Sequence, residues 1–144
     1  MKKLLLLLLV VFALNGCSTD GDNQPKVYYE LVPIDRCQMP YRMSSGETYE
    51  LDMFFNMPTT CHAYKGIYFE GEGNVKTVAI QATVFERNDC TVIPTSNNGS
   101  PSFTTAKYNF TAGAPGTMYT FKIWTGKNEQ GENTFYEVEV PVTN

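Results

Sequence analysis

The sequence predicts an all-β domain in which two antiparallel sheets pack face to face as a sandwich. Apolar and polar residues alternate along seven segments, and from residue 26 onward apolar residues keep a helical spacing for no more than about one turn. Clusters of Gly, Pro, Asn and Asp separate these segments. Seven short strands in one small domain favour a sandwich, and a small antiparallel β-barrel is the alternative.

The chain opens with the features of a secretory signal peptide. Two lysines precede an unbroken apolar run at residues 4–14, which is too short to span a bilayer as a helix. The run leads into Leu14-Asn15-Gly16-Cys17, which resembles the lipobox of bacterial lipoproteins. This resemblance implies that residues 1–16 are removed as a type II signal peptide and that Cys17 is acylated as the new N-terminus.

The resemblance also implies a location. Bacterial lipoproteins carry several acyl chains, and more than one chain makes a stable anchor. Ser18 follows the cysteine, whereas an aspartate there would favour the inner membrane, so we expect the outer membrane. Residues 17–25 are polar and contain Gly and Pro, which is typical of a flexible tether, with a surface-export signal as the alternative. Residues 26–144 then form the single domain.

Four strands are expected in the first half of the domain. They cover residues 26–34, 48–57, 61–70 and 75–87. Pro33 indicates an edge or a bend in the first strand. In the second strand a slip of one residue would bury two carboxylates, so its register is well specified. The turn at residues 71–74 (GEGN) joins the third and fourth strands into a hairpin.

Three more strands are expected in the second half. They cover residues 102–111, 118–125 and 134–142. A loop at residues 97–101 precedes them, and the turns at residues 112–116 and 126–131 separate them. The last strand opposes Tyr and Val to glutamates, which is the pattern of a strand with one solvated face.

One of these strands carries a resemblance to a known architecture. The segment Gly116-Thr117-Met118-Tyr119-Thr120-Phe121 resembles the sixth strand of an immunoglobulin-like (Ig-like) sandwich, in which a tyrosine precedes a core residue by two positions. Phe121 stands where antibody domains carry a cysteine, and the third strand has no Trp. The chain thus resembles small Ig-like lipoproteins of Gram-negative bacteria. This likeness implies a fold but does not indicate which ligand the domain binds.

Charge and composition exclude several classes of function. Of 11 basic residues two lie in the signal segment, so the mature chain carries 9 basic and 15 acidic side chains and no basic cluster. Nucleic acid is therefore not an expected partner. His62 is the single histidine, which excludes two-histidine metal motifs, and neither G-x-S-x-G nor a phosphate-binding glycine loop occurs. We expect no enzymatic activity, no cofactor and no metal.

The cysteines predict one disulfide. Cys61 opens the third strand and Cys90 follows the fourth, so the hairpin brings them to the same end of the sandwich. In an oxidising compartment we expect a Cys61–Cys90 bond. Cys37 is then a small buried residue or a free thiol, and its pairing with either of the others is the alternative. A zinc site that adds His62 to the three cysteines is disfavoured, because neighbouring strand residues point to opposite faces.

Aromatic side chains supply the candidate binding surface. Trp124 falls on the polar face of its strand, and Tyr64 and Tyr68 are out of phase with Ile67. Exposed aromatics on a sheet stack on sugars or anchor protein interfaces. The sequence therefore predicts a non-catalytic binding module, lipid-anchored at the outer membrane or cell surface, with an unidentified protein or glycan ligand. A periplasmic accessory subunit of an envelope complex is the alternative, and a metal-binding or hydrolytic protein is a weaker one.

Overall fold

The computed structural model describes residues 26–94 and 103–144, which form an all-β fold without helices. No helix in this part of the chain is long and apolar enough to cross a membrane. The strands in chain order are β1 (Val27–Val32), β2 (Arg36–Gln38), β3 (Met43–Ser44), β4 (Thr48–Phe55), β5 (His62–Glu70), β6 (Val75–Phe85), β7 (Thr104–Thr111), β8 (Met118–Lys127) and β9 (Asn133–Thr143). The seven predicted strands are confirmed as β1 and β4 to β9, and the short strands β2 and β3 are additional.

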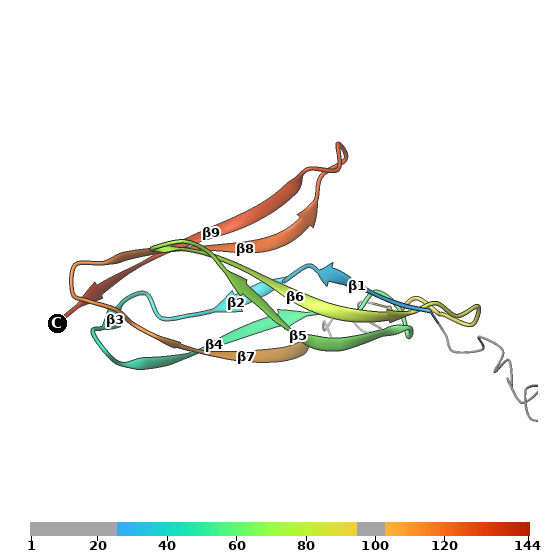
Figure 1. Ribbon diagram of the computed structural model, residues 1–144, viewed down its shortest axis with the longest axis horizontal. Helices are drawn as coiled ribbons and strands as arrows, with labels where there is room; N and C mark the ends of the chain where they lie inside the picture. The colour runs from blue at the N-terminus through green and yellow to red at the C-terminus, as the bar shows by residue number, and fades with distance from the viewer. Residues whose placement is uncertain (1–25, 95–102) are drawn as a thin grey trace, which may run out of the picture.

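The strands form two sheets of unequal width (Figure 1). The larger sheet has the order β1-β6-β8-β9-β3, with β5 paired to the other edge of β6, and the smaller sheet has the order β2-β4-β7. The two sheets pack face to face as an open sandwich, so the closed-barrel alternative is wrong. Two pairings, β6 with β8 and β3 with β9, are parallel and depart from the antiparallel pattern that the sequence predicted.

The chain passes from the larger sheet to the smaller one just after Pro33, between Ile34 and Asp35. The N–H of Ile34 still donates to the carbonyl of Trp124 in β8 at 3.0 Å, and the N–H of Asp35 donates to the carbonyl of Phe54 in β4 at 2.9 Å. Proline has no N–H to contribute to a ladder, so a point between two sheets suits it. The predicted bend at Pro33 is thus a change of sheet, and it places β2 at the edge of the smaller sheet.

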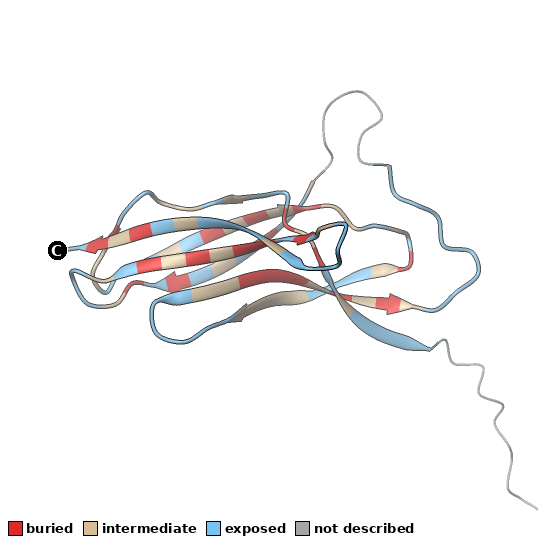
Figure 2. Ribbon diagram, turned by 90° about the horizontal axis from the view of Figure 1, so that it is seen from above, coloured by how far each residue is buried: buried red, intermediate tan, exposed pale blue. Residues whose placement is uncertain are grey.

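The core lies between the sheets, where the inward-facing residues of both form one cluster (Figure 2). Its largest fully buried members are Phe55 and Phe121, which come from opposite sheets. Tyr119 follows the Ig-like pattern: its hydroxyl oxygen accepts a hydrogen bond from the N–H of Gly113 in the turn before β8, at 3.2 Å. The β5–β6 turn requires glycine at Gly71, because a Cβ there would lie 2.0 Å from the carbonyl oxygen of Val75.

Candidate functional site

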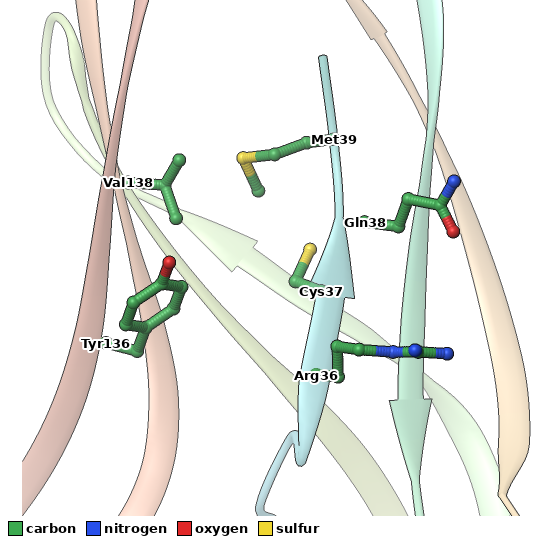
Figure 3. A pocket seen from close by; sticks show the side chains of 6 residues that line it. All are labelled: Arg36, Cys37, Gln38, Met39, Tyr136 and Val138. Atoms are coloured by element: carbon green, nitrogen blue, oxygen red, sulfur yellow. The ribbon is translucent and has the colours of Figure 1, made fainter. Parts of the chain in front are cut away.

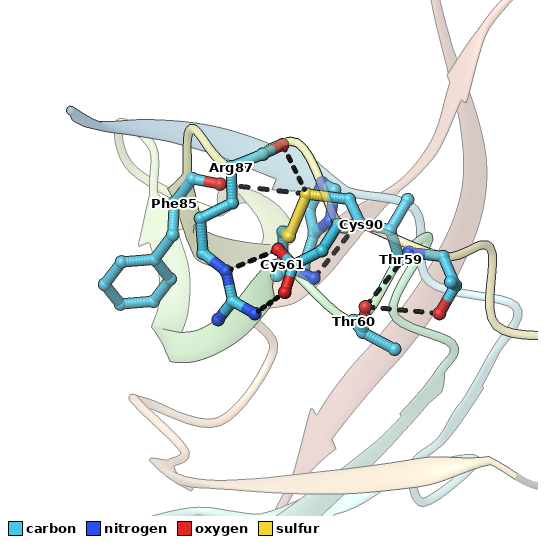
Figure 4. The surroundings of a disulfide bond; sticks show 9 residues. Thr59, Thr60, Cys61, Phe85, Arg87 and Cys90 are labelled. Carbon is cyan, nitrogen blue, oxygen red and sulfur yellow. Dashed lines mark hydrogen bonds and ion pairs between the residues drawn. A yellow bond between two sulfur atoms is a disulfide. The ribbon is translucent and has the colours of Figure 1, made fainter. Parts of the chain in front are cut away.

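Of the residues singled out from the sequence, Cys17 lies outside the described residues. The Cys61–Cys90 disulfide is confirmed, with a Cα–Cα distance of 5.4 Å across a sequence separation of 29 (Figure 4). It joins the start of β5 to the loop after β6, as the hairpin geometry predicted. In the chain-entropy model a loop of this length contributes roughly 3–4 kcal/mol of stability. Its role is to hold this end of the sandwich together.

Trp124 lies on the face that the sequence predicted, but it is not exposed there. Its side chain is only 8% exposed, and its indole N–H donates to the Oδ1 of Asn133 in β9 at 3.2 Å. Trp124 pairs with Phe135 in regular register and keeps the face opposite to Ile123, so it is buried outside the core cluster between the sheets. The expectation of an exposed indole at Trp124 is therefore corrected to a buried, hydrogen-bonded one.

Tyr64 and Tyr68 do not share a face. A register shift between Tyr64 and Gly66 turns Tyr64 to the same face as Ile67, and Tyr68 takes the opposite face. Tyr64 is 48% exposed and stacks on Phe55 with 5.9 Å between ring centroids. The Tyr68 hydroxyl donates to Glu70, and this hydrogen bond raises the pKa of the tyrosine above its usual range. The two tyrosines thus cannot form one contact surface.

His62 is held in place by two neighbours. Its Nδ1 lies 2.8 Å from the hydroxyl oxygen of Thr59, and its Nε2 lies 2.6 Å from a carboxylate oxygen of Glu30 in β1. Both ring nitrogens therefore have a partner within the protein. Among the described residues, no group of three or more His, Cys, Asp or Glu side chains lies close enough to hold a metal ion.

A hollow in the described surface is an open seam between β2 and β9, where the edges of the two sheets face each other. It contains two adjoining cavities of about 360 and 300 Å³ that share Arg36, Cys37 and Tyr136. Figure 3 shows Cys37 and Met39 pointing from β2 toward Tyr136 and Val138 of β9. The full lining of the seam is Ile34, Asp35, Arg36, Cys37, Gln38, Met39, Ile123, Thr125, Tyr136 and Val138.

Both strands that border the seam have one edge without a backbone partner. β2 pairs only with β4, and within the described residues β9 pairs on its outer side only through Val142 and Thr143, opposite β3. Along residues 133–141, the edge of β9 away from β8 has no strand partner among the described residues. An unpaired strand edge is a template for main-chain hydrogen bonds with another extended chain.

The seam contains one thiol, that of Cys37. Cys37 is the free cysteine among the described residues, and burial, aided by the nearby Asp52 carboxylate, raises the pKa of its thiol to about 12. A thiol with so high a pKa stays protonated at neutral pH, and the protonated form is a poor nucleophile and metal ligand. The Arg36 guanidinium turns away from the seam and lies over the ring of Phe54 at 4.2 Å. The seam thus has a mixed lining, more polar in the cavity beside Gln38 and more apolar in the cavity beside Ile34 and Ile123.

The sequence does not predict this seam, although it contains one signal for part of it. The alternation in the last strand put Tyr136 on the core-facing side, and Tyr136 does face inward, paired with Ile123. It is nevertheless 59% exposed, because the smaller sheet is only three strands wide and ends at β2. Sheet width depends on long-range pairing, which alternation along one strand does not report.

The chain was also compared with known proteins. The comparisons with models of protein families, with curated proteins and with solved structures each give no match.

Proposed function

We propose that this chain is a lipid-anchored, non-catalytic binding module of the outer membrane or cell surface, and that it holds an extended segment of a partner protein in the seam between β2 and β9. The lipobox-like segment that ends at Cys17 supports the anchor. The observation that carries the binding role is the seam itself, a hollow with polar and apolar parts that is bordered by two strand edges without backbone partners along most of their length.

These features suit an extended peptide in particular. In β-strand addition, main-chain hydrogen bonds supply affinity and pockets for alternate side chains supply specificity. The outer edge of β9 offers the hydrogen-bonding groups, and the two cavities are spaces for side chains of the partner. The protonated Cys37 thiol gives the seam no nucleophile at neutral pH, which favours binding over catalysis.

Site-directed photocrosslinking in living cells tests the seam. A photoreactive phenylalanine analogue at Tyr136 faces the seam, and the same analogue at Phe135 is the matched control, because neighbouring strand residues point to opposite faces. We expect one discrete crosslinked product from position 136, whose adduct maps to one short segment of one partner protein, and none from position 135. Equal products from both positions, or none from either, would contradict binding in the seam.

The alternative of a periplasmic accessory subunit keeps the same anchor and the same seam, and differs in which side of the outer membrane the domain occupies. Protease treatment of intact cells that express the tagged full-length protein separates the two, with lysed cells as the control. Digestion on intact cells would place the domain outside and favour an external partner. Protection until lysis would place it in the periplasm and favour a partner within the envelope.

A further inference from the structure

A second surface of unusual character lies at the end of the sandwich where β1 begins. There β1 carries Val27, Tyr28 and Tyr29, all more than half exposed, and β5 adds Tyr64. Figure 2 shows the start of β1 as an exposed ribbon beyond the buried centre of the molecule. We call Val27, Tyr28, Tyr29 and Tyr64 the aromatic tip. It lies apart from the residues that line the seam.

The tip presents aromatic rings on both sides of one strand. Tyr28 pairs with Val84 and shares its face with Tyr64, whereas Tyr29 pairs with Thr83 on the opposite face. The Lys65 ammonium lies 3.3 Å from the centre of the Tyr29 ring. Tyrosine has an apolar ring and a polar end, and lysine has an apolar stem and a charged end, so both suit the boundary between water and lipid.

The tether brings this end of the domain to the membrane. Lys26 lies nine positions after Cys17, and an extended chain spans at most about 3.3–3.6 Å per residue, so β1 starts within about 30 Å of the anchor. A random-coil chain of nine residues averages only about 17 Å from end to end. The β5–β6 turn lies at the other end of two strands of 9 and 11 residues, and is farther from the anchor.

The distribution of charged side chains also favours the aromatic tip as the end that faces the membrane. Around the tip the basic side chains of Lys26, Lys65 and Arg87 balance the acidic ones of Glu30, Glu86 and Asp89. The rest of residues 26–144 carries 6 basic and 10 acidic side chains, so the excess negative charge lies away from the tip. A membrane with anionic lipids would repel those other surfaces and accept the neutral one.

We propose that the aromatic tip seats the domain edge-on in the lipid interface of the membrane that holds its anchor. The proposal rests on the anchor at Cys17 that the proposed function includes. In this arrangement the tyrosines on both faces of β1 enter the headgroup region, and the far end of the sandwich, with the β5–β6 turn, points away from the bilayer.

Fluorescence quenching in vesicles tests the docking. Full-length acylated variants Tyr28→Trp and Tyr29→Trp are reconstituted into vesicles of phosphatidylethanolamine and phosphatidylglycerol, with plain or brominated acyl chains. Tyr41→Trp is the matched control, because Tyr41 is 78% exposed and precedes β3, which pairs with the end of β9 far from the tip. The native Trp124 contributes the same background fluorescence in all three variants.

We expect brominated lipid to reduce the emission of both tip variants, with a shift to shorter wavelength, and to leave the Tyr41→Trp emission unchanged. Quenching of neither tip variant, of only one, or of all three alike would overturn edge-on docking. Flotation of the wild-type chain and of Cys17→Ala with plain vesicles tests the anchor separately. Flotation of the wild type alone, without quenching at the tip, would overturn this inference and leave the anchor standing.

Discussion

The hydroxyl oxygen of Tyr119 lies too close to Gly113 to leave room for a Cβ atom on that residue. It accepts a hydrogen bond from the Gly113 N–H at 3.2 Å, and a Cβ added to Gly113 would lie only 2.7 Å from it. The Tyr119 ring is itself fixed, because it packs edge-on against Phe110 at 4.9 Å between centroids. The corner between β7 and β8 therefore depends on this tyrosine and this glycine together.

This contact predicts non-additive mutations. We expect Tyr119→Phe to lower the free energy of unfolding by about 1 kcal/mol through the lost hydrogen bond, and Gly113→Ala to lower it by about 1–3 kcal/mol through the clash. In the double variant the hydroxyl that causes the clash is gone, so its loss is smaller than the sum of the two. Urea denaturation of the four proteins measures this, and strictly additive losses would contradict the close approach.

The disulfide makes a larger prediction. Replacing both Cys61 and Cys90 by alanine removes the loop constraint, and we expect the free energy of unfolding to fall by roughly 3–4 kcal/mol. A reducing agent should shift the urea midpoint of the wild type toward that of the double variant. Cys37→Ala is the control, because it keeps the disulfide and should respond to the reducing agent as the wild type does. Equal midpoints for wild type and double variant would show that the bond contributes no stability.

Local patterns in the sequence were sufficient for the seven longer strands and for the disulfide. Alternation with a period of two is visible within one strand, and a hairpin fixes which ends of its strands meet, so Cys61 and Cys90 could be paired from the β5–β6 hairpin alone. The tyrosine of the β7–β8 corner was also visible, because Tyr119 stands two positions before the core residue Phe121.

The remaining features depend on contacts between distant segments. β2 and β3 contain three and two residues, too few to show a period, and form by pairing with β4 and β9. A register shift in β5 changes which face Tyr64 takes, and the local alternation does not mark it. Trp124 keeps the face that alternation predicts, but its burial depends on neighbours such as Asn133 of β9. The seam follows from the different widths of the two sheets, which only the complete pairing reveals.

The Cys37 thiol should be unreactive in the folded protein and should make stability depend on pH. Its pKa is raised to about 12, against about 9 in the unfolded chain, because burial and Asp52 disfavour the thiolate. We therefore expect iodoacetamide at pH 8 to modify Cys37 much more slowly in folded than in urea-unfolded protein.

The raised pKa of Cys37 also determines in which direction stability changes with pH. The stability that the neutral thiol contributes is fully present below about pH 9 and is lost as the pH rises toward about 12, because the unfolded chain releases its proton first. Urea denaturation at pH 8 and pH 10.5 should show a larger loss for the wild type than for Cys37→Ala, in which this group is absent. Equal losses in both proteins would contradict the raised pKa.

Because Trp124 is buried, we expect it to stabilise the fold and not to contact the partner, whereas Tyr136 should do the reverse. Because the side chain is enclosed and its indole N–H is bonded to Asn133, we expect Trp124→Ala to lower the free energy of unfolding by about 3 kcal/mol or more. Tyr136→Ala, a change in a mostly exposed seam residue, should alter stability by only about 0.5 kcal/mol. Binding should respond in the opposite order at a temperature where all variants are folded. The crosslinked partner should be lost with Tyr136→Ala and retained with Trp124→Ala, both assayed with the photoreactive group moved to Met39, which points into the seam. A Trp124→Ala protein of unchanged stability that has lost its partner would instead show that the indole contacts the ligand.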